Sequence, residues 1–204
     1  SFEMLFDRFG IAESSGKGKS LLVIGGAGGV GSLTIQLARK LTDLTVIATA
    51  SRPETAEWCR EMGAHEIVDH RDLVAEVQGK GFETVEYIAN YADTSQHWDA
   101  MSTLVAPQGK LGCIVETDDL IDVTSLQGKS ASLHWELMFT RSMFGTDDVA
   151  RQHDILNRIA DLVESGDIRS TLRQTLNGFS ADVLKDGHRI IETGQVFGKL
   201  VIEY

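Results

Sequence analysis

An apolar run followed directly by a glycine-rich loop constrains the fold of this 204-residue chain more than any other feature. The run Leu21–Ile24 precedes GGAGGVGS at positions 25–32, and the helical pattern SLTIQLA follows. Within the loop, Gly26, Gly28 and Gly31 have the spacing G-x-G-x-x-G. Between a strand and a helix, such glycines allow a tight turn, close approach of backbone N–H groups to a pyrophosphate, and close helix–sheet packing. The loop predicts a bound dinucleotide, with a glycine-rich turn that holds no ligand as the alternative.

A second glycine-rich stretch, GKGKS at positions 16–20, ends like a P-loop but does not meet its requirements. The first glycine of a P-loop would fall at position 13, which is Glu13, and the stretch precedes a strand instead of following one. It predicts a turn.

Short β-branched runs alternate with helical patterns along most of the chain. The strand-like runs are 21–24, 45–49, 66–68, 85–89 and 111–115, and the helical segments are 29–41, 53–62, 71–78 and 94–105. Beyond position 116 we expect a polar loop at 117–129, a sixth strand at 132–138, helices at 149–165 and 180–193, and strands at 172–176 and 199–204. Runs that are apolar on both faces are typical of parallel sheets, and right-handed crossovers through helices give a doubly wound arrangement. The sequence therefore predicts an α/β Rossmann fold with a six-stranded parallel sheet, a ligand beyond the carboxyl ends of the strands, and a C-terminal helix and strand.

Charge and cysteine content limit the partners. A formal net charge of -11 argues against nucleic acid and anionic membranes, which would repel the chain. No stretch reaches the ~20 apolar residues of a membrane span. Cys59 and Cys113 have no CxxC spacing, so neither a disulfide framework nor a structural zinc site is predicted, and a cytoplasmic location is expected. Four scattered histidines do not have the spacing of metal ligands and are expected on the solvated surface: His97, His134, His153 and His188.

The residues after the second predicted strand indicate which dinucleotide binds. An NAD-binding unit carries an acidic residue there, about 20 residues beyond the fingerprint, which holds the ribose hydroxyls. Here the sequence is TASRP at positions 49–53, with no acid. Ser51 can donate to a 2′-phosphate, and Arg52 can pair with it bidentately. NADP(H) is therefore predicted, with the alternative that Arg52 is a solvated residue ahead of a helix opened by Pro53.

Four segments in a specific order resemble the medium-chain dehydrogenase/reductases, in particular the quinone-oxidoreductase and zeta-crystallin-like branch. They are GGAGGVGSLTIQLAR, ATASRPETAEWCREMGAHEIVDHRD, LVAPQGKLGCIV and the closing GKLVIEY. ELMFTRSMFGT at 136–146 resembles the subset labelled zinc-type alcohol dehydrogenase-like. Because the family places a GroES-like catalytic domain before its coenzyme domain, the resemblance implies that residues 1–204 are an NADP(H)-binding domain with a C-terminal extension at about 172–204. The catalytic domain would then be absent from this chain.

The resemblance also implies where the cofactor lies. Gly28, Gly29 and Val30 would line the pyrophosphate, while Ser51 and Arg52 would meet the 2′-phosphate. His70 matches a position near the adenosine, with a structural loop histidine as the alternative, Asn90 matches one facing a ribose, and Val115 would lie near the nicotinamide. The predicted cofactor-binding residues are Gly26, Gly28, Gly29, Val30, Gly31, Ser51, Arg52, His70, Asn90 and Val115.

Members of this family move a hydride between a nicotinamide and a quinone, an enone or a related carbonyl compound, and the cofactor carries the chemistry. The resemblance thus implies an NADPH-dependent oxidoreductase acting on a small carbonyl or quinone substrate. Its substrate contacts, and any zinc ligands, would lie in the absent domain, so no catalytic or metal-binding residue is predicted here. A homodimer joined at the strand near 132–138 is also implied, because an apolar edge strand invites pairing; burial within the monomer is the alternative. The alternative function is a non-catalytic NADP(H)-binding sensor or scaffold.

Overall fold

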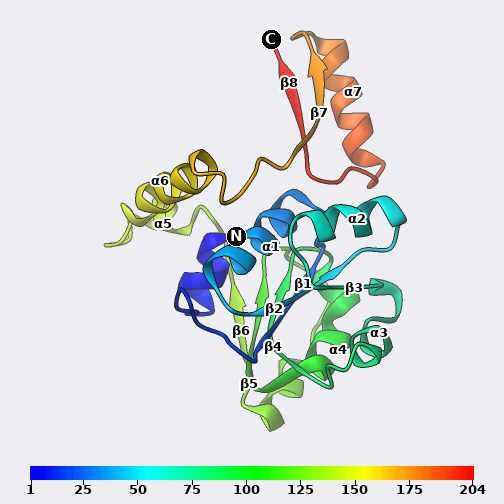
Figure 1. The fold of residues 1–204 in the computed structure, drawn as a ribbon, viewed down its shortest axis with the longest axis vertical. Coiled ribbons are helices and arrows are strands. Elements are labelled where there is room, and N and C mark those ends of the chain that lie inside the picture. Colours follow the sequence, from blue (N-terminus) through cyan, green and yellow to red (C-terminus); the bar gives the residue numbers. More distant parts are fainter.

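The computed structural model describes all residues, 1–204, and is built on a six-stranded parallel sheet (Figure 1). The order across the sheet is β3-β2-β1-β4-β5-β6. The strands are β1 (Ser20–Ile24), β2 (Thr45–Thr49), β3 (Glu66–Val68), β4 (Val85–Asn90), β5 (Val105–Cys113) and β6 (Ser132–Trp135). The chain winds outward from β1 to β3 and then crosses back to β4, so the winding direction reverses between β1 and β4. The predicted six-stranded, doubly wound α/β fold is confirmed.

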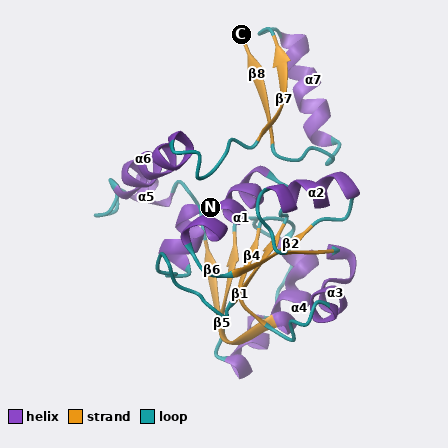
Figure 2. Ribbon diagram, in the orientation of Figure 1, coloured by secondary structure: helices purple, strands orange, loops and turns teal.

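Helices cover both faces of this sheet, as Figure 2 shows. The helices before the C-terminal unit are η1 (Glu3–Arg8), α1 (Gly29–Leu41), α2 (Pro53–Glu61), η2 (His70–Asp72), α3 (Leu73–Gly79), α4 (Thr94–Leu104), η3 (Val123–Lys129), α5 (Thr140–Phe144) and α6 (Arg151–Glu164), of which α5 and α6 lie to one side of the sheet. All five residues of β1 are buried, as expected for a strand covered on both sides.

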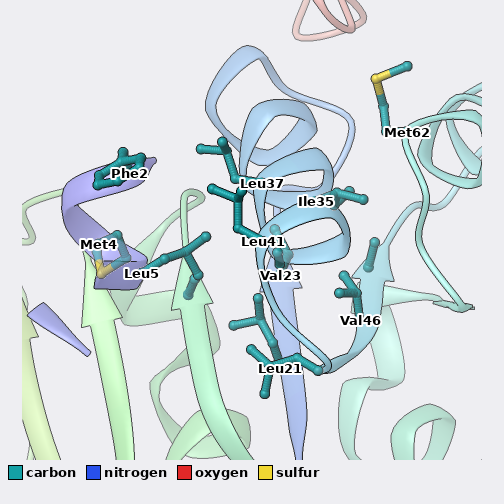
Figure 3. Close-up of a cluster of buried hydrophobic side chains, with 14 of the residues drawn as sticks. Phe2, Met4, Leu5, Leu21, Val23, Ile35, Leu37, Leu41, Val46 and Met62 are labelled. Atoms are coloured by element: carbon teal, nitrogen blue, oxygen red, sulfur yellow. The ribbon is translucent and has the colours of Figure 1, made fainter. Parts of the chain in front are cut away.

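Two hydrophobic cores lie on the two faces of the sheet. Because successive side chains of a strand point to opposite faces, Leu21 and Val23 join the core under η1, α1 and α2, whereas Leu22 and Ile24 join the one under α3 and α4. Figure 3 shows the first core, with the apolar side chains of β1 below those of α1. The apolar stripe of α1 therefore fixes this helix against β1, directly behind the glycine-rich loop.

A small C-terminal unit follows the sheet domain. It consists of β7 (Leu172–Asn177), α7 (Ala181–Glu192) and β8 (Lys199–Glu203). β7 and β8 pair in parallel as a separate two-stranded sheet, which stands apart from the six-stranded sheet at the end where α1 and α2 lie (Figure 1). The segment between α7 and β8 returns to the sheet domain, where Gly198 donates its N–H to the Ala27 carbonyl at 2.8 Å.

The structure departs from the predicted elements mainly after β4. β5 begins at Val105, six residues before the predicted start, and β6 ends at Trp135, three residues before the predicted end. η3 forms within the predicted loop, and α5 forms where no element was expected. The stretch GKGKS makes the predicted turn, in which Lys19 N–H donates to the Gly16 carbonyl at 2.9 Å. None of the helices combines the length and apolar character needed to cross a membrane.

Candidate dinucleotide-binding site

The glycine-rich loop connects β1 to α1 and is stabilised by its own backbone and by β2. Gly25 has a φ of +78°, a left-handed conformation that glycine adopts without strain, and it donates its N–H to Thr49 Oγ1 at 2.9 Å. Gly28 donates to the Gly25 carbonyl at 3.1 Å. A Cβ at Gly31 would lie 2.8 Å from the Gly26 Cα, and closer still to the Gly25 carbonyl oxygen. The loop therefore brings the N-terminus of α1, whose first N–H groups are not used within the helix, to the carboxyl edge of the sheet.

A cleft of about 290 Å³ opens at this edge. Its wall is formed by residues from five parts of the chain: 24–28 after β1, 49–55 after β2, His70 after β3, 92–97 after β4, and 194–197 of the C-terminal unit. The cleft thus lies beside the point between β1 and β4 where the winding reverses, which is where open α/β sheets bind their ligands.

Four of the predicted cofactor-binding residues line this cleft: Gly28, Ser51, Arg52 and His70. Ser51 is exposed. The Arg52 guanidinium is engaged within the chain, since its Nε lies 3.1 Å from Glu54 Oε1 and its Nη2 donates to the Gln195 carbonyl at 2.8 Å. Ser51 and Arg52 thus both lie in the wall of the cleft, and their contact with a 2′-phosphate stays a prediction.

The other glycines and Val30 lie beside the cleft and not in its wall. A Cβ at Gly26 would lie 2.9 Å from the Ala48 Cβ, so this glycine sits against β2. Gly31 packs on the loop itself, as described above. A Cβ at Gly29 would lie 2.9 Å from the Lys199 Nζ, so this lysine covers the start of α1. Val30 is half-buried, and its carbonyl accepts a hydrogen bond from the Ser1 hydroxyl at 3.0 Å.

Asn90 is the last residue of β4, as predicted, whereas Val115 lies two residues beyond the end of β5, which stops at Cys113 instead of the predicted position 115; neither residue lines the cleft. Asn90 is fully buried, and its side-chain oxygen accepts the Ala92 N–H at 3.1 Å. The Val115 carbonyl accepts the Thr94 hydroxyl at 2.5 Å. Both residues thus contribute to the turns that shape the carboxyl edge, and their contacts with a ribose and a nicotinamide stay predictions.

One histidine expected on the surface lies in the cleft instead. His97 is only 4% exposed and lines the cleft, so the expectation of a solvated His97 is wrong. The sequence held a signal for its burial: within α4, Thr94, His97, Trp98 and Met101 recur at helical spacing on one face and are all buried. His153 and His188 are exposed, as expected, whereas His134 is half-buried.

The C-terminal unit contributes two further residues that the sequence did not single out. Phe197 lines the cleft and packs edge-on against Trp58 of α2, with the ring centroids 5.8 Å apart. Lys199 places its ammonium group over the N-terminus of α1, near Gly29. These contacts join residues far apart in the sequence, and no local pattern could have predicted them.

No group of three His, Cys, Asp or Glu side chains is placed so as to hold a metal ion. Cys59 and Cys113 are both buried and unpaired. Burial raises the pKa of Cys59 to about 12, which keeps this thiol protonated and unreactive. The residues of this chain therefore do not fit a zinc site, whereas the glycine cradle and the cleft fit a dinucleotide.

Comparisons with known proteins agree with this geometry. The family model described as zinc-binding dehydrogenase matches residues 62–202. A zinc-type alcohol dehydrogenase-like protein of Staphylococcus epidermidis is 40% identical over 205 residues, which cover 99% of this chain and 61% of that protein. The chain therefore spans less than two thirds of the length of this relative.

Two solved structures are similar over the whole chain. A protein of Rhizobium etli described as a zinc-dependent alcohol dehydrogenase has a TM-score of 0.91 and 42% identity, and the match covers 100% of this chain and 60% of that one. A mycobacterial protein solved in complex with NADPH has a TM-score of 0.80 at 22% identity, and the match again covers 100% of this chain and 60% of that one. At this lower identity the second likeness concerns the fold alone.

Proposed function

This chain belongs to the zinc-binding dehydrogenases of the medium-chain dehydrogenase/reductase superfamily, and from that premise we propose that it is the NADP(H)-binding part of an oxidoreductase. The observation that carries this proposal is the cleft at the carboxyl edge of the sheet, with the glycine loop and the N-terminus of α1 on one side and Ser51 and Arg52 on the other. A pyrophosphate fits the first of these features and a 2′-phosphate the second.

The residues after β2 support NADP(H) over NAD(H). No carboxylate occupies positions 49–52, so the hydrogen-bond acceptor that would hold the free ribose hydroxyls of NAD is missing there. The Arg52 guanidinium is paired with the Glu54 carboxylate and donates a hydrogen bond to the Gln195 carbonyl. A 2′-phosphate would replace these partners with a doubly charged one that matches the planar guanidinium better. The NADPH complex of the mycobacterial protein is a precedent for this cofactor in the same fold.

We place the reaction in the class of hydride transfers to or from a small carbonyl, enone or quinone substrate. The nicotinamide supplies that chemistry when it is bound, and this chain holds and orients the cofactor. The matched relatives are longer than this chain, and we propose that the groups contacting the substrate lie in their additional part.

Titration with NADPH and NADH tests the cofactor assignment. Arg52→Ala should weaken NADPH binding about 10- to 100-fold, the value of a lost charged hydrogen bond, and should leave NADH affinity within about twofold. Arg60→Ala is the matched control, because Arg60 lies on α2, the helix that Arg52 precedes, and is exposed, with its guanidinium paired to Glu57. Equal NADPH affinity in the Arg52 variant and the unaltered chain would contradict the assignment.

Assay of the whole protein separates an enzyme from a sensor. We expect oxidation of NADPH with at least one member of a panel of quinones and enones. Binding of NADPH without turnover on any member of the panel would instead favour a non-catalytic NADP(H)-binding module.

We also propose that two copies of the protein associate through β6. This strand lies at the edge of the sheet, and beyond the buried Glu136 three apolar residues are exposed: Leu137, Met138 and Phe139. A strand edge without charged or proline residues to block it, next to exposed apolar residues, favours pairing with a second copy.

We propose a cytoplasmic location on one ground alone, the two unpaired cysteines.

A further inference from the structure

Two histidines from different elements meet at one end of the cleft. His70 begins η2 after β3, and His97 lies in the first turns of α4 after β4. Their rings are arranged edge to face, with centroids 5.9 Å apart and an interplanar angle of 87°. Both side chains line the same cleft as Ser51 and Arg52. If Arg52 meets a 2′-phosphate, as proposed above, the adenosine half of the dinucleotide would lie at this end of the cleft.

The ring nitrogens of His97 are not hydrogen-bonded to the chain, although the residue is 4% exposed. Neither nitrogen is sealed from solvent, because the one fully buried side-chain polar atom without a partner belongs to Glu136. Each ring nitrogen therefore retains some contact with solvent, and the residue lines the cleft. Burial and then the neighbouring His70 lower the pKa of His97, against a smaller opposing effect of Asp93. At neutral pH the ring is uncharged and offers one acceptor and one donor nitrogen.

Most other polar side chains that line this part of the cleft are hydrogen-bonded within the chain or exposed. Thr49 accepts the Gly25 N–H, and Thr55 bonds to the backbone of Arg52. Gln96 is exposed. His97 is therefore a buried residue of the cleft wall with free hydrogen-bonding capacity.

We propose that His97 recognises the adenine base, accepting a hydrogen bond from its exocyclic amine while His70 holds the imidazole in position from the side. This inference rests on the proposed dinucleotide function and adds to it the residue that selects the base. His97 would act together with Ser51 and Arg52, which select the phosphate.

Calorimetric titration with two ligands tests this role: NADPH, and its analogue with a hydrogen in place of the 6-amino group of the purine. The unaltered chain should bind NADPH about 3- to 10-fold more tightly, the value of one hydrogen bond between neutral groups. His97→Phe keeps a ring against His70 but has no acceptor. It should bring the ratio of the two affinities to about one by weakening NADPH alone.

The ratio separates recognition from a structural effect, because a distorted cleft would weaken both ligands equally. His97→Leu, smaller and equally apolar, repeats the measurement if the phenylalanine variant does not fold. His153→Phe is the matched control, since His153 is exposed on α6, and it should keep the ratio of the unaltered chain. A ratio near one in the unaltered chain, or a ratio unchanged by both His97 variants, would overturn the inference and leave the dinucleotide function standing. Failure of the unaltered chain to bind either ligand would overturn both.

Discussion

A single atom decides whether the glycine loop can form. The Cβ that any other residue would place at position 31 falls 2.8 Å from the Gly26 Cα, in contact with backbone that cannot move without displacing β1 or α1. Position 79, at the end of α3, is also a glycine, but no atom lies within 4 Å of its virtual Cβ. An added methyl group would therefore clash at position 31 but would fit at position 79.

We expect Gly31→Ala to destabilise the fold by about 1–3 kcal/mol, the usual cost of overpacking, and to abolish detectable NADPH binding because α1 must shift away from the loop. Thermal unfolding should show a fall in Tm of about 2–12 °C. Gly79→Ala, whose added methyl group meets no neighbour, should leave both the Tm and the NADPH affinity nearly unchanged. A Gly31→Ala protein with normal stability and affinity would contradict the packing role of this glycine.

Among the helices and strands, those whose apolar pattern lies within one short segment could be predicted from the sequence. Strands β1, β2 and β3 and helix α1 form at the predicted positions because their apolar patterns are determined within each segment. β5 was predicted too short, since Pro107 and Gly109 are unusual inside a strand; the structure carries the strand through them with a register shift against β4.

Elements that depend on partners could not be predicted in the same way. β6 ends at Trp135 because Trp135 pairs with Cys113, the last residue of β5, and the apolar residues beyond have no neighbouring strand. Likewise, the segment 194–197 reaches the cleft through contacts with residues more than 130 positions earlier, such as that between Gln195 and Arg52. The candidate site was therefore predicted for the loops after β1 and β2 and missed on its C-terminal side.

The exposed margin of β6 makes a prediction about association. Leu137 is 52% exposed two residues after the end of this edge strand, so Leu137→Asp should place a charge in the proposed contact between copies and shift the protein towards monomer in sedimentation experiments. Leu120→Asp is the control, because Leu120 is fully exposed in the loop between β5 and η3 and should leave the state of association unchanged. A monomeric unaltered protein, or a dimer insensitive to Leu137→Asp, would contradict pairing through β6.

At the scale of the whole molecule, folding shields several imidazoles from water. Burial lowers the pKa of His65, His97 and His134, and basic neighbours add to the effect: Arg39 beside His65, His70 beside His97, and Lys110 and Arg8 beside His134. Glu66 and Asp93 oppose the shift at the first two sites. The folded state therefore resists protonation at three separate histidines, one in the loop before β3, one in α4 and one in β6.

This resistance sets the direction in which stability depends on pH. Below about pH 6.5 the unfolded chain takes up protons at these histidines that the folded chain does not bind, so the free energy of unfolding should fall as the pH drops from 7.5 to 5.5. Burial raises the pKa of Glu136, so this residue makes the free energy of unfolding rise as the pH falls. Comparing histidine variants with the unaltered chain therefore isolates the contribution of each histidine better than one pH profile does. Urea unfolding of His97→Phe should show a smaller loss over this range than the unaltered chain, because one of the three histidines no longer titrates. His188→Phe, which replaces an exposed histidine on α7, should retain the full loss, and an identical loss in both variants would show that folding does not keep His97 neutral.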